Sequence, residues 1–384
     1  PAGYSQLVPK ASKVNYGFET EPEESMGGRR MYWPRGRGWG GSSSINAMVY
    51  IRGHAADYDR WQQMGNPGWS YENVLPYFKK AESFAGDGDH EVHGSDGPLS
   101  VKKSERTDYV LMDSFVEAGQ QAGFPVTDDF NGRQQEGFSR YEHTIKGNKR
   151  CSAAQAYLHP VLERPNLTTL TDVVSDRVLF NGDRAAGVSV LLNNTRQEFR
   201  ARREVILSAG AINSPQILLR SGIGPVADLH EKGIEVIQHL QGVGENLQDH
   251  VGVVSQFACT QPVTLHRSAG PIGRIIAGIK YLTSGSGDAS FPPTAAGAFF
   301  RSSPEKDLPD MQIHFAAVAI KDVHGREGIQ SKHGFSSIVY CCRPESRGAI
   351  KLADSAPGSA PLIQPNYFSC LLYTSPSPRD QRGS

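Results

Sequence analysis

The sequence lacks the features that mark several large classes of protein. It has five cysteines, an odd number with no CxxC pair, which disfavours a disulfide framework and a structural zinc site and fits a reducing compartment. No apolar run approaches the roughly 18 residues that a membrane-spanning helix needs, and the longest candidate, Ile313 to Ile320, is far shorter. Lys and Arg, 40 together, balance 40 Asp and Glu, so nucleic acid is not expected as a partner.

The composition does provide enough apolar residues for a sizeable core. Hydrophobic residues make up 38% of the 384 residues and charged residues 21%, which excludes wholesale disorder. A chain of this length suggests two or three domains, or one large interleaved α/β unit. The 41 glycines and 24 prolines indicate many turns without reaching the level of a low-complexity sequence.

Hydrophobic periodicity and turn residues predict a mixture of helices and strands. Helices are predicted over Asp57–Gln63, Tyr71–Ala81, Asp108–Ala122 and Ser214–Arg220, the last of these ending at Gly222. Strands are predicted over Leu167–Leu170, Val178–Phe180, Gly187–Leu192, Glu198–Ala201 and Glu204–Ser208, with turns at Asn181-Gly182 and Asn193-Asn194. The stretch Leu371–Ser384 has no periodicity.

The segment Pro34–Asn46 reads PRGRGWGGSSSIN and is dense in glycine and serine. It contains a formal GxGxxG that begins at Gly36, followed by Asp57 and Asp59 about 20 residues on, which is the pattern of a nicotinamide-dinucleotide loop. That pattern needs an apolar strand immediately before it, and Pro34 cannot donate to a central strand. A nicotinamide dehydrogenase built on this loop is therefore disfavoured.

Another interpretation of this segment fits the residues better. Glycines at positions 36, 38, 40 and 41 allow backbone to approach a flat ligand without Cβ collisions. The serines at 42 to 44 supply hydroxyls, and a helix predicted to follow would offer its first amides to anionic or carbonyl oxygens. The segment is thus predicted to hold the ring or the diphosphate of a cofactor.

This glycine segment, followed by Tyr50, Gly53 and Asp59, resembles the first signature of the glucose–methanol–choline (GMC) flavoprotein oxidoreductases. The run GAINSPQILLRSGIG at 210–224 is similar to the second signature. The stretches YIRGHAADYDRW, GWSYENVLPYFKKAE, GVGENLQDH at 242–250 and IQPNYFS at 363–369 resemble choline-dehydrogenase-like members. The resemblance extends from about Val14 to Ser369, in the order found in the family.

The resemblance implies an α/β (mixed α+β) fold: a Rossmann-like FAD-binding domain interleaved with a substrate domain built on an antiparallel sheet, incomplete at both ends. FAD-side segments are expected at 14–90, which includes the cofactor loop and lid, and at 144–250. Substrate-side segments are expected at 91–143 and 251–369. Residues 370–384 are expected to be a tail foreign to the fold.

The family implies oxidation of a primary alcohol to the aldehyde by hydride transfer to N5 of FAD, with a histidine as base. The partners implied are a small alcohol and an unspecified electron acceptor, a quinone or another carrier, in the cytoplasm or a mitochondrion. Val174 and Ser175 would contact adenine, although many relatives carry valine where this chain has Ser175. The full set of cofactor contacts carried over is Arg35, Gly36, Gly40, Gly41, Ser42, Ser43, Asn46, Ala47, Met48, Val49, Val174, Ser175, Ala209, Gly210, Asn246, Asp249 and His250.

Two parts of the family pattern have no counterpart in this sequence. The N-terminal GxGxxG segment is absent, and none of the twelve histidines stands in the C-terminal motif that carries the catalytic base. We therefore expect the chain by itself to be an inactive fragment, or, as the alternative, a non-catalytic remnant of the fold that acts as a binding protein. His250 is a candidate base, but a loop histidine hydrogen-bonded beside the cofactor is the favoured interpretation.

The remaining predictions concern other histidines, the flavin linkage and the substrate. His54, His90 and His93 are predicted to lie in surface loops and His314 in the core or at its rim, and no metal site is predicted. Some relatives attach the flavin covalently to a histidine in the glycine segment, where this chain has Ile45, so a non-covalent FAD is implied. Choline-type relatives carry a carboxylate near the segment equivalent to 294–301, which has none here, and this lowers choline relative to other alcohols.

Overall fold

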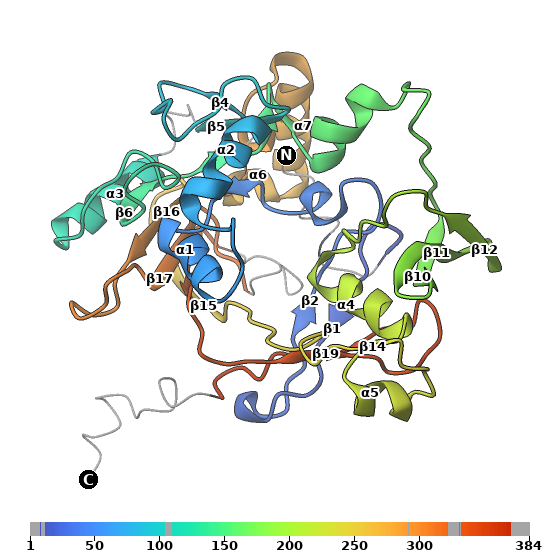
Figure 1. Cartoon of the computed structure of the whole chain (residues 1–384). Coiled ribbons are helices and arrows are strands. Elements are labelled where there is room, and N and C mark those ends of the chain that lie inside the picture. Colours follow the sequence, from blue (N-terminus) through green and yellow to red (C-terminus); the bar gives the residue numbers. More distant parts are fainter. Residues whose placement is uncertain are drawn as a thin grey trace, which may run out of the picture. The chain divides into compact units, whose positions relative to one another are not determined.

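The computed structural model describes residue 8 and residues 12–103, 110–290, 292–321, 330 and 332–369 (Figure 1). The chain divides into two compact units. Unit 1 is formed by the described residues of Pro1–Gly17, Pro34–Leu167 and His250–Arg343. Unit 2 is formed by those of Phe18–Trp33, Thr168–Asp249 and Pro344–Ser384. Each unit is therefore assembled from three separate stretches of chain.

Unit 1 is built on a five-stranded antiparallel sheet with the order β15-β18-β17-β16-β6. Its strands are β6 Gly137–Arg140, β15 Gly252–Ala258, β16 Thr294–Phe300, β17 Met311–Ala316 and β18 Gly334–Cys341. Helix α3, Val110–Gln121, packs on this sheet: the Phe115 ring lies 5.0 Å from Phe138 and 4.6 Å from Phe315, measured between centroids. Phe115 of the predicted apolar stripe thus meets the sheet, whereas Val110 and Ala118, predicted on the same side, are exposed.

A second sheet in unit 1 has the order β3-β7-β5-β4. The two helices that follow the glycine segment, α1 and α2, lie between β3 and β4 in the sequence. Its strands are β3 Val49–Tyr50, β4 Glu82–Ala85, β5 Leu99–Lys103 and β7 Glu142–His143. The other elements are α1 Ala55–Gln63, α2 Tyr71–Ala81, the hairpin β8 Ile145–Lys146 with β9 Lys149–Arg150, α6 His266–Ala269, α7 Pro271–Ser284 and the short helices η3 Gly41–Ser44, η4 Ala154–Leu158, η5 His159–Val161 and η6 Asp288–Ser290.

Unit 2 contains a three-stranded antiparallel sheet, β10 Val173–Asn181, β11 Arg184–Leu192 and β12 Thr195–Arg200. Leu219, Leu229, Val243 and Leu352 form a buried cluster beneath α4 and α5. The remaining elements are β1 Phe18–Glu19, η2 Glu24–Met26, β2 Tyr32–Trp33, α4 Gly210–Arg220, β13 Ile223–Gly224, α5 Val226–Glu231, β14 Gln238–His239, β19 Ala349–Lys351 and β20 Leu362–Gln364.

Most of the elements predicted from the sequence are present. The predicted bounds of α2 coincide with those observed, and α1, α3 and α4 begin or end within a few residues of the prediction. The two hairpin turns of the β10-β11-β12 sheet are also confirmed: Gly182, Asn193 and Asn194 all have positive φ, at 61°, 50° and 61°. Asparagine and glycine adopt this conformation most readily, which is why these turns could be predicted.

Three predicted elements are wrong. Residues 167–170 and 204–208 are not strands, and the glycine segment leads into the four-residue 3-10 turn η3 rather than a helix. The stretch 204–208 is apolar, yet Ile206 is 75% exposed. A strand requires hydrogen bonds to a neighbouring strand, and within the described residues none pairs with this stretch. The predicted tail from Leu371 lies outside the described residues.

None of the helices in the described ranges has both the length and the apolar character needed to cross a membrane.

Candidate functional site

The glycine segment of unit 1 adopts a backbone that only glycine accommodates easily. Gly38, Gly40 and Gly41 have φ values of 116°, 83° and 51°, and the 3-10 turn η3 begins at Gly41. In this left-handed region an L-residue brings its Cβ close to backbone oxygen, which costs roughly 1–2 kcal/mol per position. The repeated glycines are therefore explained by the shape of the loop.

The glycines of this loop fall into two groups. A Cβ on Gly36 would lie 2.1 Å from the carbonyl oxygen of Gly41, and a Cβ on Gly40 would lie 2.4 Å from Ser44 Oγ. These two glycines allow the loop to close on itself. A Cβ on Gly38 or Gly41 would instead meet nothing within 4 Å. One side of the loop is thus open, and a ligand can approach its backbone there.

The serine hydroxyls of the loop are used to hold its shape. Ser42 Oγ accepts a hydrogen bond from the Gly36 amide at 3.1 Å. Ser43 Oγ accepts from the Ala153 amide at 2.8 Å and donates to the Gly40 carbonyl at 2.5 Å, and Ser44 Oγ donates to Trp39 O at 2.8 Å. Recognition of a ligand by this loop would accordingly rest chiefly on its backbone groups.

The residues that flank the glycines are anchored in the core of unit 1. Asn46 Oδ1 accepts from Arg150 Nη1 at 2.6 Å and from the Met48 amide at 3.0 Å. Met48 has φ 63° and is fully buried within the main apolar cluster, and Ile45 is buried as well. The Arg35 amide donates to Asn15 Oδ1 at 3.0 Å. Together with Ala47 and Val49, the predicted contacts from 35 to 49 thus form one continuous, well-anchored segment.

The predicted adenosine contacts lie in unit 2. Val174 is half-buried and Ser175 is exposed on β10, where the register of the sheet shifts between Ser175 and Arg177. The Ser175 carbonyl accepts from Arg220 Nη2 at 3.4 Å. Gly210 has φ 82° and open space where a Cβ would stand, and it begins the 11-residue helix α4, with exposed Ala209 before it.

The loop 246–249 of unit 2 is held by a chain of hydrogen bonds that the sequence did not indicate. Tyr367 Oη donates to Asp249 Oδ2 and accepts from Trp33 Nε1 at 3.1 Å. The Glu23 carboxylate accepts from the Tyr367 amide at 3.1 Å, and burial raises the pKa of Tyr367. The sequence pointed to Tyr367 only through the stretch IQPNYFS at 363–369, which resembles the family, and not to its hydrogen-bond partners. Asn246, with φ 58°, is exposed at the start of the loop.

His250 begins the last stretch of unit 1 and is exposed. Its Nε2 lies 3.1 Å from the Cys342 carbonyl oxygen. A carbonyl only accepts, so Nε2 carries the hydrogen and is not a free base in this conformation. His314 is half-buried between the rings of Tyr141 and Tyr340, and burial lowers its pKa to about 4, so it is neutral at physiological pH.

The surface position predicted for His93 is wrong. Its Nδ1 lies 2.9 Å from Glu82 Oε2 and its Nε2 lies 2.7 Å from Asp129 Oδ2, and the side chain is buried. Arg52 Nη2 joins the same Glu82 oxygen at 2.7 Å. Burial lowers the pKa of His93, but the bonds to the two carboxylates outweigh it and raise the pKa to about 9. No local pattern predicts this network, because its bonded residues are 11, 30 and 36 positions apart in the sequence.

The other histidines predicted in loops have ordinary surroundings. His54 is the residue before α1. Its Nδ1 accepts a hydrogen bond from the Ala56 amide at 3.2 Å, and the His54 amide donates to Asp57 Oδ2 at 2.9 Å. This reciprocal pair is a capping box, which satisfies two amides at the start of the helix. His90 is exposed, as predicted.

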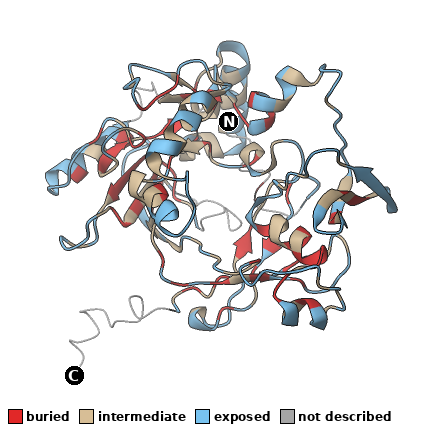
Figure 2. Cartoon of the chain, viewed as in Figure 1, coloured by how far each residue is buried: buried red, intermediate tan, exposed pale blue. Residues whose placement is uncertain are grey.

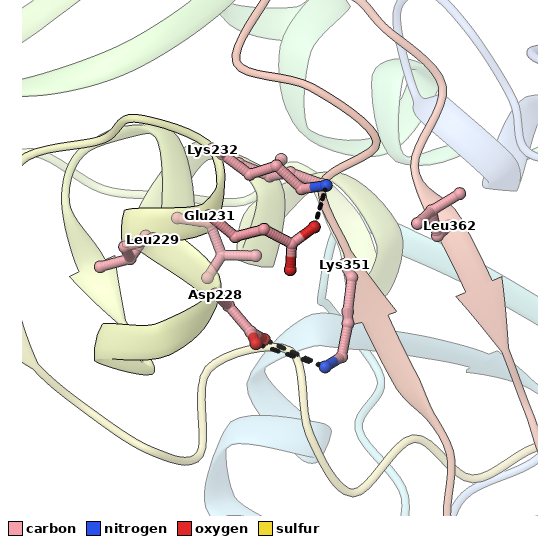
Figure 3. Close-up of a pocket in the computed structure, with 8 residues that line it drawn as sticks. Asp228, Leu229, Glu231, Lys232, Lys351 and Leu362 are labelled. Carbon is pink, nitrogen blue, oxygen red and sulfur yellow. Dashed lines mark hydrogen bonds and ion pairs between the residues drawn. The ribbon is translucent and has the colours of Figure 1, made fainter.

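A separate pocket lies in unit 2 (Figure 3). Figure 3 shows two ion pairs in its lining, Asp228 with Lys351 at 3.2 Å and Glu231 with Lys232 at 2.9 Å. The full lining is Leu219, Asp228, Leu229, Glu231, Lys232, Lys351, Leu352 and Leu362. None of the predicted site residues is among them, and the paired charges leave no net charge to attract a ligand.

Residues 17–252 match the sequence profile of the GMC oxidoreductase family. The chain is 47% identical over 357 residues to the mitochondrial choline dehydrogenase of Mus musculus, covering 93% of this chain and 59% of that protein. It is 46% identical over 355 residues to the oxygen-dependent choline dehydrogenase of Brucella ovis, covering 92% of this chain and 64% of that one. The chain thus spans about three fifths of the length of these relatives.

Solved structures share the fold. Pyridoxine 4-oxidase from Mesorbium loti aligns with a TM-score of 0.82 at 26% identity, covering 100% of this chain and 69% of that one. A formate oxidase aligns with a TM-score of 0.86 at 24% identity, covering 96% and 70%. The mixed α/β fold predicted from the sequence is confirmed.

Proposed function

The chain belongs to the GMC oxidoreductase family, as its two signatures predict, and we propose that an enzyme of full family length carrying it oxidises a primary alcohol to the aldehyde with FAD. The observation that carries this proposal is the glycine segment of unit 1. Its backbone is open to a ligand at Gly38 and Gly41. At Gly36 and Gly40 the loop packs against itself, and the serine hydroxyls hold this shape by hydrogen bonds. The names of the most similar relatives support alcohol oxidation.

The residues present fit FAD. Open backbone at Gly38 and Gly41 suits a flat ring or a diphosphate, because no side chain keeps the ligand at a distance. In unit 2, Gly210 begins α4, and the first amides of an 11-residue helix favour phosphate or other anionic oxygens. When bound, FAD supplies the hydride acceptor at N5. The residues proposed to contact it are the segment 35–49 and His250 in unit 1 and the segments 174–175, 209–210 and 246–249 in unit 2.

We propose that this binding is non-covalent. The residue at the position where some relatives carry a linking histidine is Ile45, which has no nucleophilic atom and is buried in unit 1. We do not propose His250 as the catalytic base, because its Nε2 donates to the Cys342 carbonyl. The family resemblance implies a histidine as the base that takes the proton of the substrate hydroxyl, and we assign this role to no residue of this chain.

The substrate proposed is a small primary alcohol. Strand β16 and Arg301 cover the segment in which choline-type relatives carry a carboxylate, and it contains Thr294, alanines, glycine and phenylalanines instead. A quaternary ammonium would have no opposite charge there. Choline and uncharged aliphatic and aryl alcohols are therefore the two groups that the assay must separate.

The test is a turnover assay with purified full-length enzyme, FAD, an artificial electron acceptor and a panel of primary alcohols that includes choline. We expect aldehyde formation with at least one alcohol, and turnover by His250→Ala in proportion to the FAD that it binds. Loss of turnover in His250→Ala, with FAD content unchanged, would show that the base has been assigned wrongly. FAD binding without turnover of any alcohol would favour the alternative, a non-catalytic binding protein with this fold.

A further inference from the structure

Helix α7, Pro271–Ser284 in unit 1, points its large apolar side chains away from the protein. Figure 2 colours most of this helix as exposed. Soluble proteins rarely leave a continuous apolar stripe uncovered unless something binds it. The exposed fractions are 75% for Ile272, 62% for Ile275, 61% for Ile276, 58% for Ile279 and 83% for Leu282.

These five residues, which we call the α7 apolar face, form one stripe. With about 100° between successive residues of a helix they fall within an arc of about 120°. The opposite side carries Gly273, Ala277 and Tyr281, which are partly buried, and Tyr281 Oη donates to the Asn148 carbonyl at 3.1 Å. Gly273, Ala277 and Tyr281 thus face the protein and the large aliphatic residues face outward, the reverse of an ordinary surface helix.

The charged side chains on α7 itself are of one sign. The helix contains Arg274 and Lys280 and no acidic residue. Asn148 lies in the turn of the β8–β9 hairpin, so this hairpin is next to the C-terminal end of α7 and contributes the exposed Lys146 and Lys149. An apolar stripe bordered by cations complements a surface that is apolar inside and negatively charged outside.

We propose that α7 docks the protein on the surface of an anionic phospholipid bilayer. The helix would lie parallel to the bilayer with the α7 apolar face among the upper acyl chains. Lys280 lies beside the α7 apolar face and Arg274 about 80° beyond its other edge, and long basic side chains at such positions can extend to lipid phosphates. The helix is about 21 Å long, and a strip of that length is sufficient for reversible interfacial binding rather than for permanent insertion.

A second copy of the chain fits this face less well. A standard protein interface buries about 800 Å² per partner, more than one 14-residue helix stripe supplies. A two-fold arrangement would also bring the cations of one helix toward the same cations of the other, without an acid on either helix to balance them. Both points favour the lipid surface.

The test is flotation of the 384-residue chain with vesicles of phosphatidylcholine alone and of phosphatidylcholine mixed with phosphatidylserine. We expect binding to the mixed vesicles that weakens with added salt. The pair Ile276→Asn with Ile279→Asn should lower the partition coefficient at least about tenfold, because it removes buried aliphatic surface. The pair Arg274→Gln with Lys280→Gln should lower it about fivefold per charge on mixed vesicles only.

Three comparisons keep the proposal falsifiable. Met64→Gln removes an equally exposed apolar side chain elsewhere in unit 1, and should bind as the unchanged chain does. If the variant with both isoleucines replaced has a lower melting temperature than the unchanged chain, the variant with Arg274→Gln and Lys280→Gln still tests the proposal. Equal binding by all variants, or no binding to mixed vesicles, would overturn it. A concentration-dependent dimer in sedimentation that the isoleucine pair dissociates would also overturn it and assign the face to a second copy.

Discussion

At Gly36 the absence of a side chain allows the glycine segment to close, since a Cβ would stand 2.1 Å from backbone oxygen. We predict that Gly36→Ala lowers the free energy of unfolding by more than about 2 kcal/mol, because backbone must shift to relieve the clash. FAD affinity should fall with it. Urea unfolding and a flavin fluorescence titration of the full-length enzyme measure the two effects.

The matched control is Gly123→Ala in the same unit. Gly123 also has positive φ, 87°, but open space around its Cβ position, so only the backbone strain of roughly 1 kcal/mol is expected. FAD affinity should be unchanged in this control. Equal losses in the two variants would mean that the close approach at Gly36 has no special importance.

A second residue-scale prediction concerns Glu142, a fully buried carboxyl whose Oε2 accepts from Asn131 Nδ2 at 3.2 Å. Burial, with Asp129 adding to it, raises the pKa of Glu142 from 4.5 to about 7. The folded state therefore holds this proton more tightly than the unfolded state does. The stability that Glu142 contributes is fully present below pH 4.5 and is lost as the pH rises through about 7.

Glu142→Gln should remove this pH dependence, because the amide keeps the shape of the carboxyl and cannot ionise. At about pH 8 the variant should be more stable than the unchanged chain by about 2–3 kcal/mol, and at about pH 4 by much less. Urea unfolding of both proteins at the two pH values measures the difference. A difference that stays constant between them would contradict the prediction.

At the scale of elements, local signals predict well and distant partners do not. Helix α2 has its predicted bounds because its start is encoded by Ser70, whose Oγ accepts from the Asn73 amide at 3.3 Å, and its apolar stripe is continuous. The glycine segment was found for the same reason, since its shape depends on neighbouring glycines. The stretch 204–208 was misassigned because a strand depends on a partner that hydrophobicity does not reveal.

The site shows the same division. The segment 35–49 could be predicted from its own residues, whereas the bond from Tyr367 to Asp249 joins positions 118 residues apart. His93 was predicted to lie in a surface loop, yet Glu82 and Asp129 enclose it. Burial of a polar side chain depends on such distant partners, so a single sequence cannot show it.

The hydrogen-bond network of His93 leads to a prediction about the stability of residues 82–97, which include β4. With its pKa raised to about 9, His93 is protonated at neutral pH and balances Glu82 and Asp129. Its stabilisation is present below the unfolded value of 6.5 and is lost as the pH rises through about 9. His93→Gln should lower the free energy of unfolding at neutral pH by about 3 kcal/mol, because Asp129 loses its cation and Glu82 keeps only Arg52.

Arg133→Gln is the control for this network. Arg133 pairs with Asp89 at 2.8 Å in the same part of unit 1, but both side chains are exposed, so little change in stability is expected. Hydrogen exchange should show faster opening of residues 82–97 in His93→Gln and not in Arg133→Gln. Similar behaviour of the two variants would mean that the buried network does not hold these segments.

At the scale of the whole molecule, the chain forms two units that are interleaved along the sequence. Each unit draws on three stretches of chain, and the predicted cofactor contacts are divided between them, 35–49 and His250 in unit 1 and the others in unit 2. The domain ranges predicted from the sequence, such as 14–90 and 144–250, stay predictions, as do the individual FAD contacts. The family, in contrast, is established by the match over 17–252.

The full-length enzyme should release its flavin when it is denatured. Ile45 is buried and offers no atom for a covalent bond, so acid precipitation should leave the flavin in the supernatant. Absorbance of the supernatant and the pellet measures the division. Yellow colour that stays in the pellet after washing with denaturant would contradict the prediction and indicate an attachment at some other residue.

The central claim is that this chain orients FAD for oxidation of a primary alcohol, and anaerobic reduction of the bound flavin tests it most directly. The full-length enzyme is mixed with each alcohol in the absence of any electron acceptor, and the visible flavin absorbance is followed. The account predicts bleaching by at least one primary alcohol with formation of one aldehyde per flavin, and loss of bound flavin in Gly36→Ala. An enzyme that holds FAD but is bleached by no alcohol would contradict it.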